Sequence, residues 1–219
     1  MVFDLDDTLY PERDYVLSGY QAVSAQLQLQ LKTDRRFDHW LWQRFMAGKS
    51  AGAFDTLNAY FRLGMSKADI KGLVEVYRNH VPFIHPYDDV PATLERLHKR
   101  CKLGLLSDGL LPAQQLKLDV LGLARHFDAV VFTEELGRKA WKPSAAGFER
   151  ASKLLDTPHE SCAYVADNPC KDFVAPNKLG WLTVQFLRPD QVYSQNPAPS
   201  GGEPQVVVNS AAKLRTALG

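Results

Sequence analysis

The stretch that decides the fold is MVFDLDDTLY, residues 1–10, in which a short apolar run leads directly into acids. Residues 1–3 read as a brief buried strand. Asp4, Asp6 and Asp7 follow, and three carboxylates within four residues repel one another unless a cation lies near them. A hard divalent cation with oxygen ligands meets that need. Taken alone, an Asp-x-Asp pair is more often a solvated turn, so the rest of the chain must decide.

The pattern of apolar residues changes twice beyond this stretch. Residues 14–81 carry apolar side chains at steps of three or four and read as helices throughout, the last beginning at a capping box formed by Ser66 and Asp69. After His85-Pro86, short apolar runs alternate with helical patterns. These runs are KLGLL (102–106), FDAVVF (127–132), CAYV (162–165), WLTVQF (181–186) and QVVV (205–208). Such alternation predicts a parallel sheet with helices on both faces.

The predicted fold is therefore α/β, with a doubly wound parallel sheet and an inserted α-helical domain. We expect residues 1–13 and 83–219 to form the Rossmann-like core, with a helix at 211–218 near its end. We expect residues 14–82 to form the helical insert. Ligand chemistry in such a sheet gathers at the carboxyl ends of the strands.

A small polar group follows the expected strand 102–106. It consists of Ser107, Asp108 and Gly109. A hydroxyl beside backbone amides at a helix start is a suitable contact for a phosphate. A helix cap explains the same residues equally well when the group stands alone.

Two further groups complete the pattern. Lys142 comes directly before Pro143, which suits the start of a helix, and the nearby Lys139 competes with Lys142 for any role. Asp167 and Asp172 follow the CAYV strand, and acids at this spacing across a loop and a helix start can face one metal ion. No single group is decisive, but their order and spacing are.

Together, FDLDDTLY, LLSDG, a lysine before proline and YVADNPCKDF resemble the four motifs of the haloacid dehalogenase-like superfamily. The helical segment falls where capped members of that family carry their cap. The resemblance implies that Asp4 is the nucleophile and Asp6 the general acid/base, with Ser107 and Lys142 as the other catalytic residues. It assigns substrate binding to Ser107, Asp108, Gly109 and Lys142, and metal binding to Asp4, Asp6, Asp167 and Asp172.

The activity implied by the resemblance is a Mg²⁺-dependent phosphomonoesterase that forms an aspartyl-phosphate. Its substrate would be a small phosphorylated metabolite, either a sugar phosphate or a nucleoside monophosphate. A 2-haloacid dehalogenase uses the same nucleophile without a metal, so Asp6 and the Asp167/Asp172 pair argue against it. A phosphomutase stays open, because exclusion of water is not readable from a sequence. A non-catalytic binding module is disfavoured, because every catalytic position is filled.

Bulk composition limits the partners of the chain. Its 219 residues carry a net charge of +1, which gives no sign of nucleic acid or a membrane surface as partner. No apolar run is long enough to span a bilayer, and residues 1–4 show neither the basic region nor the apolar core that are typical of a signal sequence. The cysteines Cys101, Cys162 and Cys170 form no CxxC pair and suit reduced thiols. We expect a cytoplasmic monomer or homodimer whose partner is a small phosphorylated molecule.

Overall fold

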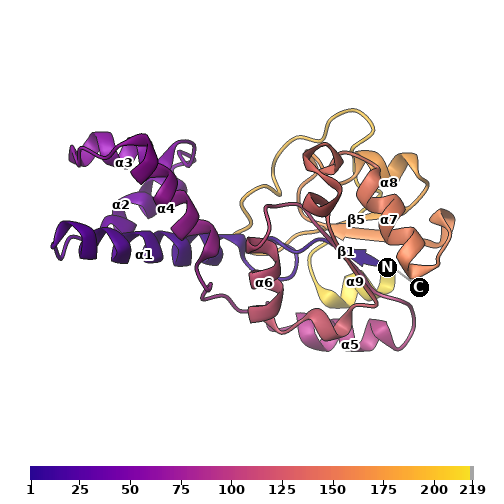
Figure 1. Ribbon diagram of the computed structural model, residues 1–219. Helices are drawn as coiled ribbons and strands as arrows, with labels where there is room; N and C mark the ends of the chain where they lie inside the picture. Colours follow the sequence, from indigo (N-terminus) through magenta and orange to yellow (C-terminus); the bar gives the residue numbers. More distant parts are fainter. Residues whose placement is uncertain (218–219) are drawn as a thin grey trace. The chain divides into compact units, whose positions relative to one another are not determined.

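The computed structural model describes residues 1–217, so residue 218 of the expected helix 211–218, and residue 219, lie outside the described residues. The chain forms two compact units (Figure 1). The first comprises Met1–Arg13 and the chain from Ile84 onward, and the second comprises Asp14–Phe83. Each unit is built around a buried apolar core of its own.

A parallel sheet forms the centre of the first unit. Within residues 1–217 it has six strands in the order β3-β2-β1-β4-β5-β6, and all neighbouring pairs are parallel. The strands are β1 (Val2–Phe3), β2 (Gly104–Ser107), β3 (Ala129–Phe132), β4 (Ala163–Ala166), β5 (Leu182–Phe186) and β6 (Val206–Val208). Nearly every residue of the first five is buried, which explains their continuous apolar runs. The predicted doubly wound α/β fold is confirmed.

Helices cover both faces of this sheet, with α7 and α8 on one side and α5 and α9 on the other (Figure 1). The helices of this unit are α5 (Val90–His98), α6 (Ala113–Leu121), α7 (Ala146–Leu155), α8 (Val174–Lys178) and α9 (Ala211–Ala217), with 3-10 turns at Ala124–His126, Thr133–Leu136, Arg138–Ala140 and His159–Ser161. In the core, the ring of Phe148 on α7 lies edge-on to the rings of Tyr164 and Trp181, with ring centroids 4.9 Å and 5.6 Å apart. Full burial of a side chain of this size stabilises the fold by roughly 1.5–3 kcal/mol.

The strand order places a topological switch point beside β1. From β1 the chain continues outward to β2 and β3, and then returns to β4, β5 and β6 on the other side of β1. Ligands of open α/β sheets bind outside the carboxyl ends of the strands at such a point. Asp4 directly follows β1, and Asp167 directly follows β4, so the fold brings both acids to this place.

The second unit is helical, as the apolar periodicity predicts. Its helices, all within the described part of the chain, are α1 (Glu12–Leu31, which starts in the first unit), α2 (Phe37–Met46), α3 (Ala53–Phe61) and α4 (Lys67–Asn79). The expected capping box opens α4: the Ser66 N–H donates to the Asp69 carboxylate at 2.8 Å, and the Asp69 N–H donates to Oγ of Ser66 at 3.2 Å. Across residues 1–217, no helix combines the length and apolar character needed to cross a membrane.

Two helices begin later than the sequence pattern indicates. α7 begins at Ala146 rather than at Pro143, and α8 begins at Val174, so Asp172 lies in the loop ahead of the helix and not at the helix start. In the second case the Asn168 N–H donates to Oδ2 of Asp172, while the Asp172 N–H donates to the carbonyl oxygen of Asn168, both at 3.0 Å. These reciprocal bonds close residues 168–172 into a loop ahead of the helix.

Candidate active site

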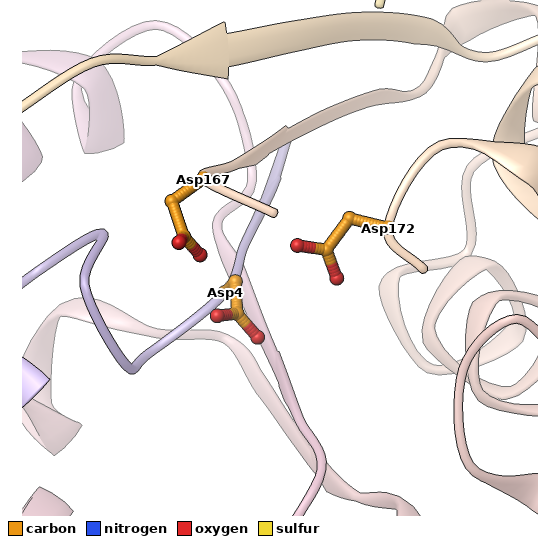
Figure 2. Close-up of side chains that lie close together, drawn as sticks. All are labelled: Asp4, Asp167 and Asp172. Atoms are coloured by element: carbon orange, nitrogen blue, oxygen red, sulfur yellow. The ribbon is translucent and has the colours of Figure 1, made fainter. Parts of the chain in front are cut away.

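Three carboxylates converge at the switch point (Figure 2). One oxygen from each of Asp4, Asp167 and Asp172 lies within 4.8 Å of the other two, and all three residues are buried. Strands β1 and β4 deliver the first two acids, and the closed loop after β4 delivers the third. The structure thus brings together three of the four metal ligands expected from the sequence.

This carboxylate group fits a hard divalent cation. Oδ2 of Asp167 is buried and has no hydrogen-bond partner among the described residues. Burial holds the pKa of Asp167 well above its ordinary value, and the nearby charges of Asp172 and Asp4 raise it further. A cation with oxygen ligands would stabilise all three groups in their ionised form. The cluster can therefore hold a metal ion.

Lys142 is the buried counter-charge of the same group. Its ammonium lies 2.6 Å from Oδ1 of Asp4, 2.7 Å from Oδ1 of Asp172 and 2.9 Å from the hydroxyl of Tyr164. Burial alone lowers the pKa of Lys142, but Asp172 and Asp4 outweigh it and hold that pKa well above its ordinary value. Burial raises the pKa of Asp4 to about 6, and Lys142 opposes that rise. The lysine thus favours the ionised Asp4, the form that can attack as a nucleophile.

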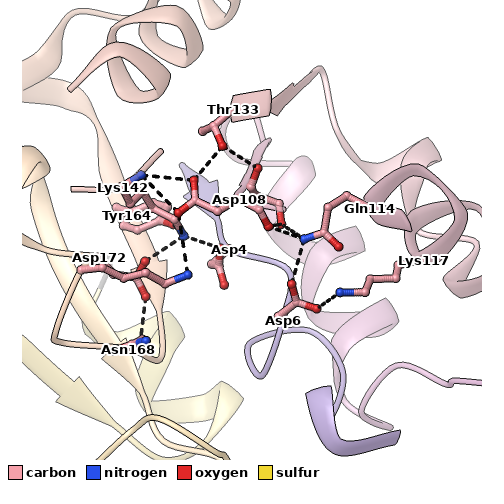
Figure 3. A network of polar contacts seen from close by, with 12 residues as sticks. Asp4, Asp6, Asp108, Gln114, Lys117, Thr133, Lys142, Tyr164, Asn168 and Asp172 are labelled. Atoms are coloured by element: carbon pink, nitrogen blue, oxygen red, sulfur yellow. Dashed lines mark hydrogen bonds and ion pairs between the residues drawn. The ribbon is translucent and has the colours of Figure 1, made fainter. Parts of the chain in front are cut away.

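The side chain of Asp108 holds Lys142 in place (Figure 3). Its two carboxylate oxygens accept the backbone N–H of Lys142 at 3.2 and 3.1 Å, and Oδ1 also accepts the hydroxyl of Thr133 at 2.7 Å. The half-exposed ammonium of Lys171 lies 3.8 Å from Oδ2. The carboxylate of Asp108 is thus engaged by contacts within the protein, and the expected part of Asp108 in substrate binding stays a prediction.

Ser107 and Gly109 lie around the amide of Gln114. Ser107 is the last residue of β2 rather than the first beyond it. Nε2 of Gln114 lies 2.8 Å from Oγ of Ser107 and also donates to the carbonyl oxygen of Asp108. Gly109 has a φ of +139°, and a Cβ there would lie 2.7 Å from the side chain of Gln114. Glycine is therefore required both by the backbone conformation and by the space that Gln114 fills.

The carboxylate of Asp6 lies outside the group formed by the three clustered acids, and the expected part of Asp6 in metal binding stays a prediction. Its Oδ1 accepts hydrogen bonds from the ammonium of Lys117 at 2.7 Å and from the hydroxyl of Tyr10, while Oδ2 accepts the amide of Gln114 at 2.8 Å. Burial raises the pKa of Asp6, but Lys117 and these hydrogen bonds outweigh it and hold the pKa below its ordinary value. The positive charge of Lys117 on α6 attracts the Asp6 carboxylate and is the physical reason why it lies outside the group of three acids.

The third acid of the opening stretch has a structural position. Asp7 adopts a left-handed backbone conformation with a φ of +54°. Its carboxylate accepts the N–H of Val192 at 2.6 Å and that of Glu12 at 2.8 Å, which pins the loop after β5 to the loop after β1. Burial raises the pKa of Asp7 to about 6. Because its carboxylate is engaged by these two backbone N–H groups, Asp7 has a structural role and is not one of the reacting groups.

Several residues of the site are absent from the sequence-based expectations, among them Gln114, Lys117, Thr133 and Tyr164. Gln114 and Lys117 are three residues apart, so they share one face of a helix, and this spacing is a signal that the sequence carries. Thr133 directly follows β3, as Asp4 follows β1. Tyr164 lies inside an apolar run, and nothing in the pattern marks its hydroxyl as part of a site.

Comparison with known proteins tests the resemblance seen in the motifs. The family described as haloacid dehalogenase-like hydrolase matches residues 1–185. The glyceraldehyde 3-phosphate phosphatase of Methanopyrus kandleri is 31% identical, over 86% of this chain and 83% of its own. That of Methanocaldococcus jannaschii is 29% identical, over 86% of this chain and 84% of its own.

A solved structure agrees with the fold. The 2-haloacid dehalogenase from Pseudomonas syringae pv. Tomato DC3000 has a TM-score of 0.66 and 21% sequence identity, and the match covers 99% of this chain and 96% of that one. At this identity the likeness concerns the fold alone. The family match spans most of the chain, from the acids after β1 to the strand β5 beyond the carboxylate group. The chain belongs to the haloacid dehalogenase-like hydrolases, which confirms the prediction made from its four motifs.

Proposed function

We propose that this hydrolase is a Mg²⁺-dependent phosphomonoesterase that acts on a small phosphorylated metabolite through an aspartyl-phosphate at Asp4. The observation that carries the proposal is the buried group in which Asp4 lies beside two further carboxylates and the ammonium of Lys142. The relatives named as glyceraldehyde 3-phosphate phosphatases support phosphoryl chemistry and a small substrate. A triose phosphate is accordingly the first substrate to test.

Asp4, Asp167 and Asp172 would hold the metal. When bound, Mg²⁺ supplies positive charge that brings the anionic nucleophile and the anionic phosphoryl group together. The chain adds its own charge through Lys142, whose ammonium is fixed between Asp4 and Asp172. Because phosphoryl transfer depends mostly on positioning and charge neutralisation, these fixed groups supply what the reaction needs.

The first half of the reaction forms a bond between Asp4 and phosphorus. A carboxylate oxygen of Asp4 attacks the phosphorus atom while the bond to the leaving oxygen breaks. Asp6 gives a proton to that oxygen, so the product departs as an alcohol. The hydroxyl of Ser107 and the ammonium of Lys142 hold the phosphoryl oxygens during the transfer.

The second half releases phosphate. A water molecule attacks the phosphorus atom, Asp6 takes a proton from this water, and the bond from phosphorus to Asp4 breaks. Asp6 is thereby returned to its protonated form and Asp4 to its carboxylate form, so the cycle balances.

Residues 14–82 are proposed to be the cap that reads the part of the substrate beyond its phosphate. The compact helical unit Asp14–Phe83 supports this assignment, since in the sequence it comes between β1 and β2, the next strand of the core. A cap that closes during the reaction would exclude water and strengthen the charge interactions around Asp4. Whether water is excluded fully enough for a phosphomutase is a separate question that product analysis answers.

The dehalogenase alternative shares the fold, so the fold does not separate the two activities. Asp6 and the Asp167/Asp172 pair separate them, because a dehalogenase of this family needs neither a metal nor the second aspartate of the opening motif. All three acids are present: Asp167 and Asp172 lie beside Asp4 (Figure 2), and Asp6 belongs to the polar network drawn in Figure 3. Their presence favours the phosphatase.

The test is a substrate panel assayed with Mg²⁺ and with excess chelator. The panel should contain 4-nitrophenyl phosphate, triose and hexose phosphates, a nucleoside monophosphate and 2-chloropropionate. We expect phosphate release that depends on Mg²⁺ and no halide release. Halide release without phosphate release would refute the phosphatase, and transfer of the phosphoryl group to a second hydroxyl instead of water would indicate a mutase.

A further inference from the structure

We propose that Gln114 and Lys117 of α6 are positioning residues for Asp6, and that Gln114 also fixes Ser107 relative to Asp6. The inference rests on the proposed function, in which Asp6 transfers protons and Ser107 holds the phosphoryl group. Neither residue belongs to the four motifs, and both come from the helix that follows the second motif.

The first argument is burial. Gln114 is 2% exposed and Lys117 is 6% exposed, although glutamine and lysine side chains are seldom fully buried without a partner. Three residues apart, they lie on one face of α6 and both reach Asp6. A lysine in that position loses its hydration, and the ion pair with Asp6 compensates for the loss. A surface-solvating role is therefore ruled out for this face of the helix.

The second argument is geometry at Asp6. The ammonium of Lys117 bonds to Oδ1 at 2.7 Å, and the amide of Gln114 bonds to Oδ2 at 2.8 Å. Because each donor holds a different oxygen, the plane of the carboxylate is fixed. The hydroxyl of Tyr10 adds a further bond to Oδ1. A proton-transfer group must be held in a narrow range of positions, and a displacement of about 1 Å can cost about 100-fold in rate.

The third argument concerns Ser107. Nε2 of Gln114 shares its two hydrogens among Oγ of Ser107, Oδ2 of Asp6 and the carbonyl oxygen of Asp108, so the Ser107 hydroxyl accepts from Gln114 at 2.8 Å and keeps its own hydrogen for another acceptor. In the structure that hydrogen bond goes to the carbonyl oxygen of Asp108 over a long 3.4 Å, which a phosphoryl oxygen can replace. One amide thus connects the group that transfers protons to the group that holds phosphate.

The two residues should therefore give different kinetic signatures. Lys117 is paired with Asp6, so its loss should harm the transfer of a proton to the leaving oxygen. Gln114 bonds to both Asp6 and Ser107, so its loss should harm proton transfer and also phosphate binding. An alkoxide leaving group needs the proton, whereas 2,4-dinitrophenolate departs without it. A purely structural role would not discriminate between leaving groups.

The experiment compares kcat/KM for an alkyl phosphate and for 2,4-dinitrophenyl phosphate, with Mg²⁺ present. The variants are Lys117→Met, Lys117→Arg, Gln114→Leu and, as the matched control on the same helix, Gln115→Leu. Gln115 is exposed and bonds to Asp119 at 2.8 Å. Circular dichroism establishes that each variant is folded, and Lys117→Gln replaces Lys117→Met if the latter is not.

We expect Lys117→Met to lower kcat/KM for the alkyl phosphate by about 100-fold, and the loss for the dinitrophenyl ester to be at least about tenfold smaller. Lys117→Arg should recover most of the alkyl phosphate activity. Gln114→Leu should lower both values, more for the alkyl phosphate, and raise KM for both esters. Gln115→Leu should stay within about twofold of the wild type, as a surface substitution does.

Equal losses for the two esters in folded Lys117 variants would refute the inference while leaving the phosphatase intact. Wild-type rates in those variants would refute it as well. A wild-type protein that hydrolyses neither ester would instead refute the proposed function, and the inference with it.

Discussion

Replacing Lys142 with methionine tests whether the buried acids of the site depend on this single ammonium group. Methionine keeps most of the stem and removes the charge. The ammonium lies 2.6 Å from Asp4 and 2.7 Å from Asp172, and its side chain is 1% exposed. At an effective dielectric constant of about 20, each pair attracts with roughly 6 kcal/mol before desolvation is counted. Measured costs of removing one partner from a buried pair are about 3–5 kcal/mol, and we expect a loss in this range.

The loss should depend on pH in a definite direction. Burial already raises the pKa of Asp4 to about 6 in the presence of Lys142. Without the lysine this pKa rises further, so from about pH 6 up to the new value the folded variant binds a proton that the folded wild type does not. Over that window the unfolding free energy of the variant falls by about 1.4 kcal/mol per pH unit relative to the wild type. The deficit is therefore smaller at pH 6 than at pH 8.

Urea unfolding at pH 6, 7 and 8, followed by circular dichroism and tryptophan fluorescence, measures this deficit. Excess chelator is needed so that no divalent cation replaces the missing charge. Lys139→Met is the matched control, because Lys139 is exposed and lies in the same segment before α7, and it should change stability by less than about 0.5 kcal/mol. A deficit below about 1 kcal/mol, or one that does not change with pH, would contradict the reasoning. Turnover should also fall far more in Lys142→Met than in Lys139→Met.

Three further outcomes are expected. Asp4→Asn should abolish turnover of 4-nitrophenyl phosphate while circular dichroism stays native, because the amide is no nucleophile; a near-normal rate would move the nucleophile elsewhere. Excess chelator should abolish turnover and added Mg²⁺ should restore it, whereas full activity in chelator would contradict metal assistance. Gly109→Ala should destabilise the fold and slow turnover more than Gly137→Ala does, because both have positive φ but only at Gly109 would the Cβ meet a neighbour, Gln114; equal effects would contradict this packing argument.

The fold was predictable because its signals are local. Strand runs such as AVVF and AYVA are apolar without alternation, which indicates burial on both faces, and each is followed by a helical pattern. Asp4 and Asp167 could be assigned to a shared edge because parallel strands align their carboxyl ends. The register was less accessible: Ser107 pairs with Phe132 inside the sheet, although its polar side chain suggested that the strand had already ended.

The arrangement around Asp6 was not predictable, because it depends on contacts between distant parts of the chain. Gln114 and Lys117 are 108 and 111 residues away from Asp6. Their side chains reach it only because β2 lies next to β1 and α6 turns one particular face toward the strand ends. Spacing along α6 shows which residues share a face but not what that face meets. The position of the Asp6 carboxylate outside the group of three acids was hidden for the same reason, since the lysine with which it pairs lies far away in sequence.

The charges of the site explain why binding of a metal ion and binding of a phosphate ester depend on each other. Lys142 lies between Asp4 and Asp172, and Lys117 is paired with Asp6. After these pairings, Oδ2 of Asp167 remains buried without a hydrogen-bond partner among the described residues, and the raised pKa of Asp167 shows that the group resists full ionisation unless a cation is added.

A phosphoryl group adds further negative charge to this place, and its binding beside three carboxylates would be strongly unfavourable without an additional cation. A haloacid substrate carries a carboxylate but no phosphoryl group. A site for a haloacid would therefore not need a cation, nor the further acids that bind one. The same three acids thus favour a divalent cation, and that cation would make the site suitable for a phosphate ester. This reasoning predicts that Asp167→Asn, which removes a buried acid whose ionisation the site disfavours, raises stability in excess chelator while it weakens Mg²⁺ binding and turnover. A variant that lost stability in chelator would show that Asp167 is balanced by the protein itself, and the argument for the metal would fail.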